Sequence, residues 1–144
     1  MRRRKHFLYV GKYFISETFQ WFRFENLVNE SSDGGLVMSS FRPLDDIGSM
    51  QLTAGGYRIL SVPNAGGNSV LSEVLSFELL SRCFSAKLKQ TEMEVEYFPH
   101  GGSITDYVCE LFNTTVGVSV TRAIKFKGDF SLDDALRLLN KKLK

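Results

Sequence analysis

The sequence predicts a single α+β domain over residues 1–144, and three observations support this fold class. Residues 6–60 are rich in aromatic residues and partly alternate, which is typical of strands. Residues 70–88 and the segment from Ser131 onward carry apolar positions at helical spacing. Residues 103–126 form two alternating runs joined by a short turn. We therefore expect an N-terminal antiparallel β meander followed by a core of α-β-β-β-α order.

Composition excludes few classes of protein. The 144 residues are enough for one core, with 43% hydrophobic and 24% charged residues as in ordinary globular proteins. The net charge of +2 does not by itself indicate nucleic acid. No run approaches the ~18–20 apolar residues of a membrane helix, so no membrane partner is expected. Cys83 and Cys109 show neither metal spacing nor a disulfide framework, which favours an intracellular location, nuclear or cytoplasmic.

The N-terminal part is expected to hold strands in sequence order. The candidate strands are the aromatic or alternating stretches 6–17, 18–28, 36–44 and 50–60. A Gly-Gly pair interrupts the last stretch, and the polar turn "SSDGG" follows the second.

The breaker segment "SVPNAGGNS", residues 61–69, separates this part from the second half of the chain. Asn68 or Ser69 is expected to cap a helix over 70–88, and a strand is expected over 91–98. The last helix begins at Ser131, where Asp134 completes a capping box. The chain ends in this polar helix, as a fragment or a short form of a longer protein would.

Glu78 is the first candidate site residue. On a helical wheel it falls between Val74 and Leu71 and so points into an apolar face. A buried carboxylate is costly unless it is paired, protonated or bound to metal. The alternatives are a helix end tilted out of the core and a buried pair with an arginine. Glu73 lies close to the helix N-terminus and is interpreted as a surface residue favoured by the helix dipole.

The two strands predicted over residues 103–126 carry further candidate site residues. Alternation predicts one core face and one small, polar face on the second strand. The core face is expected to hold Val116, Val118, Val120 and Ile124, and the polar face Gly117, Ser119, Thr121 and Ala123. Asp106 and Glu110 alternate with the apolar positions of the first strand. If the polar sides align, Asp106 and Glu110 lie beside Ser119 and Thr121, and Glu78 reaches the same cleft.

This arrangement resembles the PD-(D/E)xK nuclease superfamily, which includes Holliday junction resolvases and restriction-endonuclease-like enzymes. The resemblance rests on the α-β-β-β-α order, a Glu on the first helix, Asp106 at the start of the second strand and a valine-rich third strand. It covers residues 68–144. It implies a restriction-endonuclease-like core, a nucleic-acid substrate and Mg²⁺ or Mn²⁺ as cofactor.

The resemblance also implies roles for single residues. Glu78, or Glu73, matches the helix acid and Asp106 the strand acid, which makes Glu78 and Asp106 the expected metal ligands. Ser119 then stands at the second acid and Thr121 at the lysine. A hydroxyl offers a hard dication no charge, and Thr121 cannot replace an ammonium group beside an attacking water. Glu110 could take over the second acid, and Lys125 or Arg122 the cation.

We therefore expect a nucleic-acid-associated protein whose metal-dependent nuclease site is degenerate or inactive, without a cofactor unless it is active. Phosphate contacts are expected from Lys125, Lys127 and Arg137, and they need no metal. The alternative is a non-enzymatic module that binds a protein partner on a nuclease-like scaffold, through aromatic strands such as "YFISETFQWFRF". An unrelated α+β enzyme is a third possibility. The sequence leaves the oligomeric state open.

Overall fold

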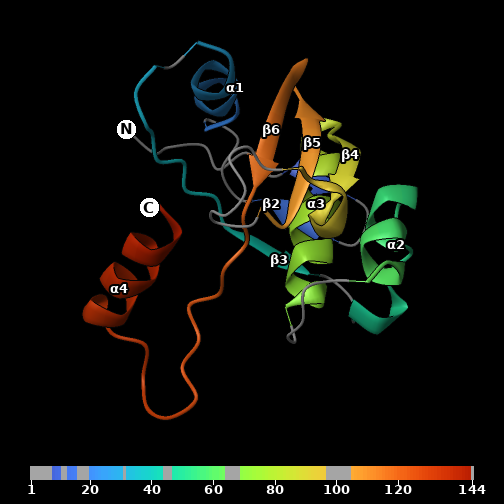
Figure 1. The fold of residues 1–144 in the computed structure, drawn as a ribbon. Coiled ribbons are helices and arrows are strands. Elements are labelled where there is room, and N and C mark those ends of the chain that lie inside the picture. The colour runs from blue at the N-terminus through green and yellow to red at the C-terminus, as the bar shows by residue number, and fades with distance from the viewer. Residues whose placement is uncertain are drawn as a thin grey trace.

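The computed structural model describes residues 8–10, 13–15, 20–30, 32–43, 47–63, 69–96 and 105–143. It is an α+β fold, as predicted (Figure 1). The helices are α1 (Gln20–Glu30), α2 (Ala54–Ser61), α3 (Val70–Phe84) and α4 (Leu132–Lys142), with short 3₁₀ turns at Ile47–Ser49 and Glu92–Glu94. The strands are β1 (Leu8–Val10), β2 (Tyr13–Ile15), β3 (Phe41–Pro43), β4 (Lys87–Thr91), β5 (Tyr107–Leu111) and β6 (Thr114–Val118).

The strands form two antiparallel sheets, ordered β1-β2-β3 and β4-β5-β6. In the second sheet Tyr107 pairs with Val118, and Cys109 with Val116. Helix α3 lies against this sheet (Figure 1), and the ring of Phe77 meets that of Tyr107 edge-to-face at 5.7 Å between centroids. From residue 69 onward the described elements run α3-β4-β5-β6-α4, which is the predicted order.

The predicted strand over 18–28 is wrong, because most of this stretch belongs to α1. Aromatic residues favour strands locally, but Phe24, Leu27 and Val28 also share a helical face. Phe24 packs edge-to-face on Phe84 and Phe112, with centroid distances of 5.1 and 5.6 Å. Tertiary packing of this helical face overrides the local strand preference. Of the strand predicted over 36–44, residues 36–43 are described, and among these only Phe41–Pro43 is in β conformation.

The predicted strand over 50–60 is also wrong, because it contains helix α2. The side chain of Thr53 caps this helix by accepting a hydrogen bond from the N–H of Gly56 at 3.2 Å. The Gly-Gly pair is a contact surface between helices. An ideal Cβ on Gly55 would lie 2.3 Å from Phe77 Cε1, and one on Gly56 would lie 2.1 Å from Glu78 Oε1. Glycine therefore allows α2 to approach α3.

Helix α3 ends at Phe84, four residues before the predicted end at 88. Ser85 adopts the left-handed conformation with φ 57°, and the N–H of Ala86 closes the helix on the carbonyl of Leu80. The following strand accordingly begins at Lys87 and ends at Thr91. The strand predicted over 91–98 is wrong for residues 92–96, and residues 97 and 98 lie outside the described residues. At the other end Ser69 holds the N-cap position, but its side chain does not cap the helix.

The core lies between α2, α3 and the β4-β5-β6 sheet. It is formed by buried apolar side chains, namely Ile59, Val74, Phe77, Ala86, Tyr107, Cys109 and Leu111. Val116, Val118 and Val120 pack against it on the predicted face, where they are half-buried. Ile124 is 67% exposed, so its predicted place in the core is wrong. The strand ends at Val118, and alternation no longer directs side chains beyond that point.

Helix α4 lies to one side of the remaining fold, connected to β6 by the long segment 119–131 (Figure 1). Its N-terminus has the predicted capping box, in which Ser131 accepts from the N–H of Asp134 and Asp134 accepts from the N–H of Ser131. Across the described ranges, no helix is both long and apolar enough to cross a membrane.

Candidate functional site

Glu78 lies in the core, as predicted, with 1% of its surface exposed. Its Oε2 accepts from Arg82 Nε at 2.7 Å, one helical turn away. Its Oε1 accepts from both the N–H and the hydroxyl of Thr53, at 2.8 and 2.7 Å. These bonds offset the cost of burying the charge. Of the alternatives that the sequence left open, the structure shows the buried pair with an arginine.

The bonds of Glu78 join two helices. Both carboxylate oxygens are turned toward Arg82 and the first turn of α2, and Arg82 also donates to the carbonyl of Gln51. The carboxylate therefore fixes the segment that leads into α2 onto α3. The contacts of Glu78 with Thr53 and Arg82 lie at this junction between α2 and α3, and none of them reaches Asp106.

Glu73 is the helix acid that lies near Asp106. It is 3% exposed, so the interpretation as a surface residue is wrong. Ser69 donates its hydroxyl to Glu73 Oε1 at 2.6 Å. Burial raises the pKa of Glu73, and the nearby carboxylates of Asp106 and Glu92 raise it further, while Ser69 and Lys142 lower it. Glu73 on α3 thus interacts electrostatically with one acid in the turn after β4 and with one just before β5.

Asp106 holds the end of β6. It immediately precedes β5, and its N–H donates to the carbonyl of Val118 at 3.0 Å. Its Oδ2 accepts from the N–H of Val120. Asp106 therefore binds the backbone on both sides of Ser119, which sets the path of the chain as it leaves the sheet.

Ser119 and Thr121 follow the end of β6 and are both exposed, so their predicted place on the strand is wrong. Ser119 lies next to Asp106, because Asp106 is hydrogen-bonded to the backbone of Val118 and of Val120, the two residues that flank Ser119. Glu110 does not join them, because β5 pairs it with Thr115. Lys89 binds Glu110 at 2.8 Å, which lowers the pKa of this carboxyl. The alternation of polar and apolar residues predicted that Glu110 and Ser119 share a face of the sheet. It did not predict the pairing register of β5 and β6, which places Glu110 opposite Thr115.

Lys142 brings a cation to this cluster from α4. Its Nζ donates to Ser119 Oγ at 3.0 Å, and its charge lowers the pKa of Glu73. The ammonium group therefore binds the serine and also acts electrostatically on Glu73. Sequence reasoning missed Lys142 as a site residue, although it shares the half-buried face of α4 with Ala135 and Leu138 at positions i, i+3 and i+7.

The donors of this cluster do not fit a divalent metal. Glu73 is engaged by Ser69, Asp106 by the N–H of Val120, and Glu78 by Thr53 and Arg82. In the part of the chain that the structure describes, no three His, Cys, Asp or Glu side chains are arranged to hold a metal ion. The arrangement provides a buried acid, Glu73, whose pKa is raised by burial and lowered by Ser69 and the ammonium group of Lys142.

A basic groove of about 300 Å³ lies between α4 and the segment 119–131. Four cations line it together with Asp134 and three apolar side chains; the lining residues are Arg122, Ile124, Lys125, Phe130, Asp134, Arg137, Leu138 and Lys141. Lys125 and Arg137 were predicted to contact phosphates. Lys127, the third predicted residue, is exposed in the nearby loop and is not part of the lining.

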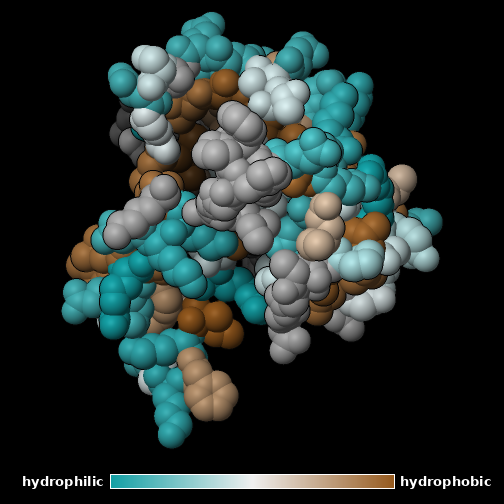
Figure 2. Space-filling model, in the orientation of Figure 1, coloured by the Kyte–Doolittle hydropathy of each residue, from teal (hydrophilic) through white to brown (hydrophobic). Residues whose placement is uncertain are grey.

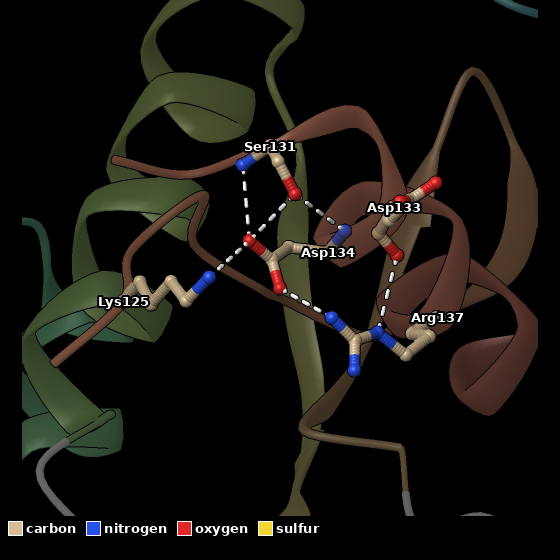
Figure 3. Close-up of polar contacts among 5 residues, drawn as sticks. All are labelled: Lys125, Ser131, Asp133, Asp134 and Arg137. Atoms are coloured by element: carbon tan, nitrogen blue, oxygen red, sulfur yellow. Dashed lines mark hydrogen bonds and ion pairs between the residues drawn. The ribbon is translucent and has the colours of Figure 1, made fainter. Parts of the chain in front are cut away.

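Asp134 organises the groove (Figure 3). Its Oδ2 accepts from Lys125 Nζ at 2.9 Å and its Oδ1 from Arg137 at 2.8 Å, while Ser131 donates from both its N–H and its hydroxyl. Lys125 first, and then Ser131, hold the pKa of Asp134 well below its ordinary value. One carboxylate therefore caps α4 and positions two of the cations in the groove.

The chain is similar to a known protein whose description states no activity. The chain is 43% identical over 129 residues to a Dictyostelium discoideum protein described as "AAC-rich mRNA clone AAC4 protein". The match covers 83% of this chain and 19% of the relative, so the chain spans about a fifth of the relative's length. No family model matches the chain. No solved structure matches it.

Proposed function

We propose that this chain binds nucleic acid through phosphate contacts in the basic groove, on a PD-(D/E)xK-like core whose nuclease site is inactive. The observation that carries the proposal is the lining of the groove, where Arg122, Lys125, Arg137 and Lys141 face a single carboxylate. Phosphate contacts from arginine and lysine supply most of the affinity of non-specific binding to nucleic acid.

The acid cluster supports the inactive half of the proposal. Ser119 provides no carboxylate, and the cation near it comes from α4 and is hydrogen-bonded to Ser119. The carboxylate of Asp106 is held by a backbone N–H. Losing preorganised charge of this kind costs roughly 10²–10³ in rate for each group. A core of α3-β4-β5-β6-α4 order can thus keep the nuclease-like scaffold without the chemistry, and the proposal assigns it no cofactor.

Binding is tested by fluorescence anisotropy with single-stranded, duplex and branched nucleic acids over a range of salt concentrations. We expect affinity to fall linearly with salt on a logarithmic scale. The variants Arg137→Gln and Lys141→Gln should each weaken binding and reduce the salt slope by about one. Lys87→Gln is the matched control, since Lys87 is an exposed cation on β4. The absence of binding at low salt would overturn the proposal.

Cleavage is tested on the same substrates with Mg²⁺ or Mn²⁺. We expect no turnover above background. Metal-dependent cleavage that disappears in Asp106→Ala would show that the site has migrated and is active, and Mg²⁺ or Mn²⁺ would then be its cofactor. Persistence of a trace activity in Asp106→Ala would instead identify a contaminant.

A second candidate function is a protein-interaction module, which exposed aromatic side chains favour. Phe22 on α1 and Phe126 in the segment before α4 are both largely exposed. The aromatic stretch 13–24 was predicted to form this surface, and Phe22 lies in it, although residues 16–19 are outside the described residues. If nucleic acid does not bind, Phe22→Ser and Phe126→Ser are the variants with which to map a protein partner.

A further inference from the structure

The basic groove also carries apolar and aromatic side chains. Its lining includes Ile124, Phe130 and Leu138, and the ring of Phe130 is half-buried there. Phe126 immediately follows Lys125, which lines the groove, and its side chain is 99% exposed. Figure 2 shows apolar side chains among hydrophilic ones in the region of α4 and the segment before it, at the lower left of the view. The groove therefore combines positive charge with an aromatic ring at its rim that is open to a ligand.

The groove keeps an excess of positive charge in spite of its internal ion pairs. Asp134 pairs with Lys125 at 2.9 Å and with Arg137 at 2.8 Å, so two cations share one carboxylate. Arg122 and Lys141 are the other cations of the lining. An ammonium group has three donors and a guanidinium five, so both partners of Asp134 retain donors for a further anion. Four cations and a single carboxylate leave three positive charges uncompensated among the lining residues.

This combination suits a single strand of nucleic acid better than a duplex. In a duplex the bases are stacked and paired, and only their edges are accessible in the grooves. The apolar side chains of the lining would then face charged phosphates and remove them from water, which is costly. In a single strand the flat faces of the bases are accessible and stack on aromatic side chains, while the phosphates meet lysine and arginine.

We propose that the groove binds single-stranded nucleic acid, with a base stacked on Phe126 at the rim and the phosphates held by the lining cations. This inference rests on the proposed function and names the form of nucleic acid that the groove takes. The ion pair of Lys125 with Asp134 joins the segment 119–131 to α4, which holds Phe126 next to the groove. Lys127, the exposed residue on the other side of Phe126 in the sequence, supplies a cation for a neighbouring phosphate.

Fluorescence anisotropy at fixed salt tests the form of nucleic acid with three DNA probes of equal length: a single strand, an abasic single strand and a duplex. The abasic strand keeps the phosphates and lacks the bases, so it isolates stacking from charge. We expect the single strand to bind more tightly than the duplex. It should exceed the abasic strand by about 5- to 150-fold for each stacked base. An RNA strand of the same sequence should show the same dependence on stacking, since every base has a face.

Phe126→Ser tests the ring directly, because a side chain that is 99% exposed can be shortened without leaving a cavity. The variant should bind the single strand about 5- to 150-fold more weakly and bind the abasic strand and the duplex like the wild type. Its salt slope should not change, because stacking releases no counterions. Phe126→Trp keeps an aromatic ring and should bind the single strand at least as tightly as the wild type.

Phe22→Ser is the matched control, since Phe22 is an exposed phenylalanine on α1 that does not line the groove, and it should bind all probes like the wild type. Equal binding of the normal and the abasic strand would overturn the stacking inference and leave the proposed binding of nucleic acid intact. A Phe126→Ser variant that loses as much affinity for the duplex as for the single strand would have the same consequence. If no probe binds at low salt, the proposed function itself fails.

Discussion

The ammonium group of Lys142 donates to the hydroxyl of Ser119 at 3.0 Å, which joins the last helix to the residue that follows β6. The same charge lowers the pKa of Glu73, while Asp106 raises it. Four residues from four separate parts of the chain thus share one electrostatic environment.

The pKa of Glu73 should respond in opposite directions to the loss of its two charged neighbours. Lys142→Met removes a positive charge and should raise the pKa of Glu73, whereas Asp106→Asn removes a negative charge and should lower it. The measurement is an NMR titration of the Glu73 carboxyl carbon. Lys141→Met, a neutralisation at the next residue, should leave the titration close to wild type. If the pKa of Glu73 shifted in the same direction in both variants, the effect of these neighbours on it would not be electrostatic.

Glu73 should also make the protein less stable as pH rises. Its pKa is raised in the folded state, so between the ordinary value of 4.5 and the folded value the native chain binds more protons than the unfolded chain. The free energy of unfolding therefore falls with rising pH in that window. Glu73→Gln keeps an acceptor for Ser69 and should remove this fall, as measured by urea unfolding across pH.

Glu110→Gln is the contrast for this pH dependence. The pKa of Glu110 is lowered by Lys89, so its contribution is present above 4.5 and is lost as pH falls toward the folded value. The two variants should therefore change the pH profile of stability with opposite sign. If the free energy of unfolding of the two variants depended on pH in the same way, Glu73 would not be buried in solution.

Glu78 should matter for stability far more than an exposed carboxylate does. Glu78→Ala leaves Arg82 and Thr53 without their partner, and breaking a buried pair costs about 3–5 kcal/mol in the free energy of unfolding. Urea unfolding measures the difference. Glu94→Gln, at the exposed pair with Arg58, is the control and should unfold close to the wild type. Equal effects of the two variants would rule out the anchoring role of Glu78.

Gly56→Ala should destabilise the protein, although alanine is the better helix former by about 1 kcal/mol. The new Cβ would lie 2.1 Å from Glu78 Oε1 and would push the carboxylate away from Thr53. Overpacking of this kind costs about 1–3 kcal/mol, which exceeds the gain in helix propensity. The net effect of the substitution on the free energy of unfolding is therefore a loss. Thermal unfolding measures it, with Gly34→Ala as a control because no atom lies within 4 Å of its added Cβ. A rise in Tm for Gly56→Ala would contradict the close approach of α2 and α3.

Ser131→Ala should weaken α4 locally by about 1 kcal/mol, because the helix loses its N-cap acceptor. Amide hydrogen exchange over residues 132–142 should quicken, while exchange in β5 should not change. Asp133→Asn is the control, since it keeps both halves of the capping box. Uniform quickening in both elements would show that α4 unfolds only together with the core.

Local patterns were sufficient for much of the fold. Helical spacing predicted α3 and α4, and alternation predicted the buried face of β5, where Tyr107, Cys109 and Leu111 all lie in the core. The wheel position of Glu78 predicted its burial. These features depend on residues within a few positions of one another, and the period of the pattern carries the information.

Local patterns failed where a segment's conformation depends on a distant partner. Residues 50–60 and 18–28 resemble strands, yet 54–60 and 20–28 are helical. These helices are stabilised by contacts with α3, which ends at Phe84, and with Phe112. The Gly-Gly pair is required because the side chains of Phe77 and Glu78 on α3 lie directly against it. Propensity is a weak preference that tertiary packing overrides.

The sequence by itself determined the buried face of β5, the burial of Glu78 and the order of elements from α3 to α4. Only the tertiary structure decided which acid lies near Asp106 and where the cation comes from. Periodicity reveals that a side chain faces inward but not what lies across from it, so Glu78 was preferred although Glu73 is the neighbour of Asp106. Alternation predicted a strand through Ile124, but the strand ends at Val118, and the path of the segment 119–131 carries Lys142 back to Ser119.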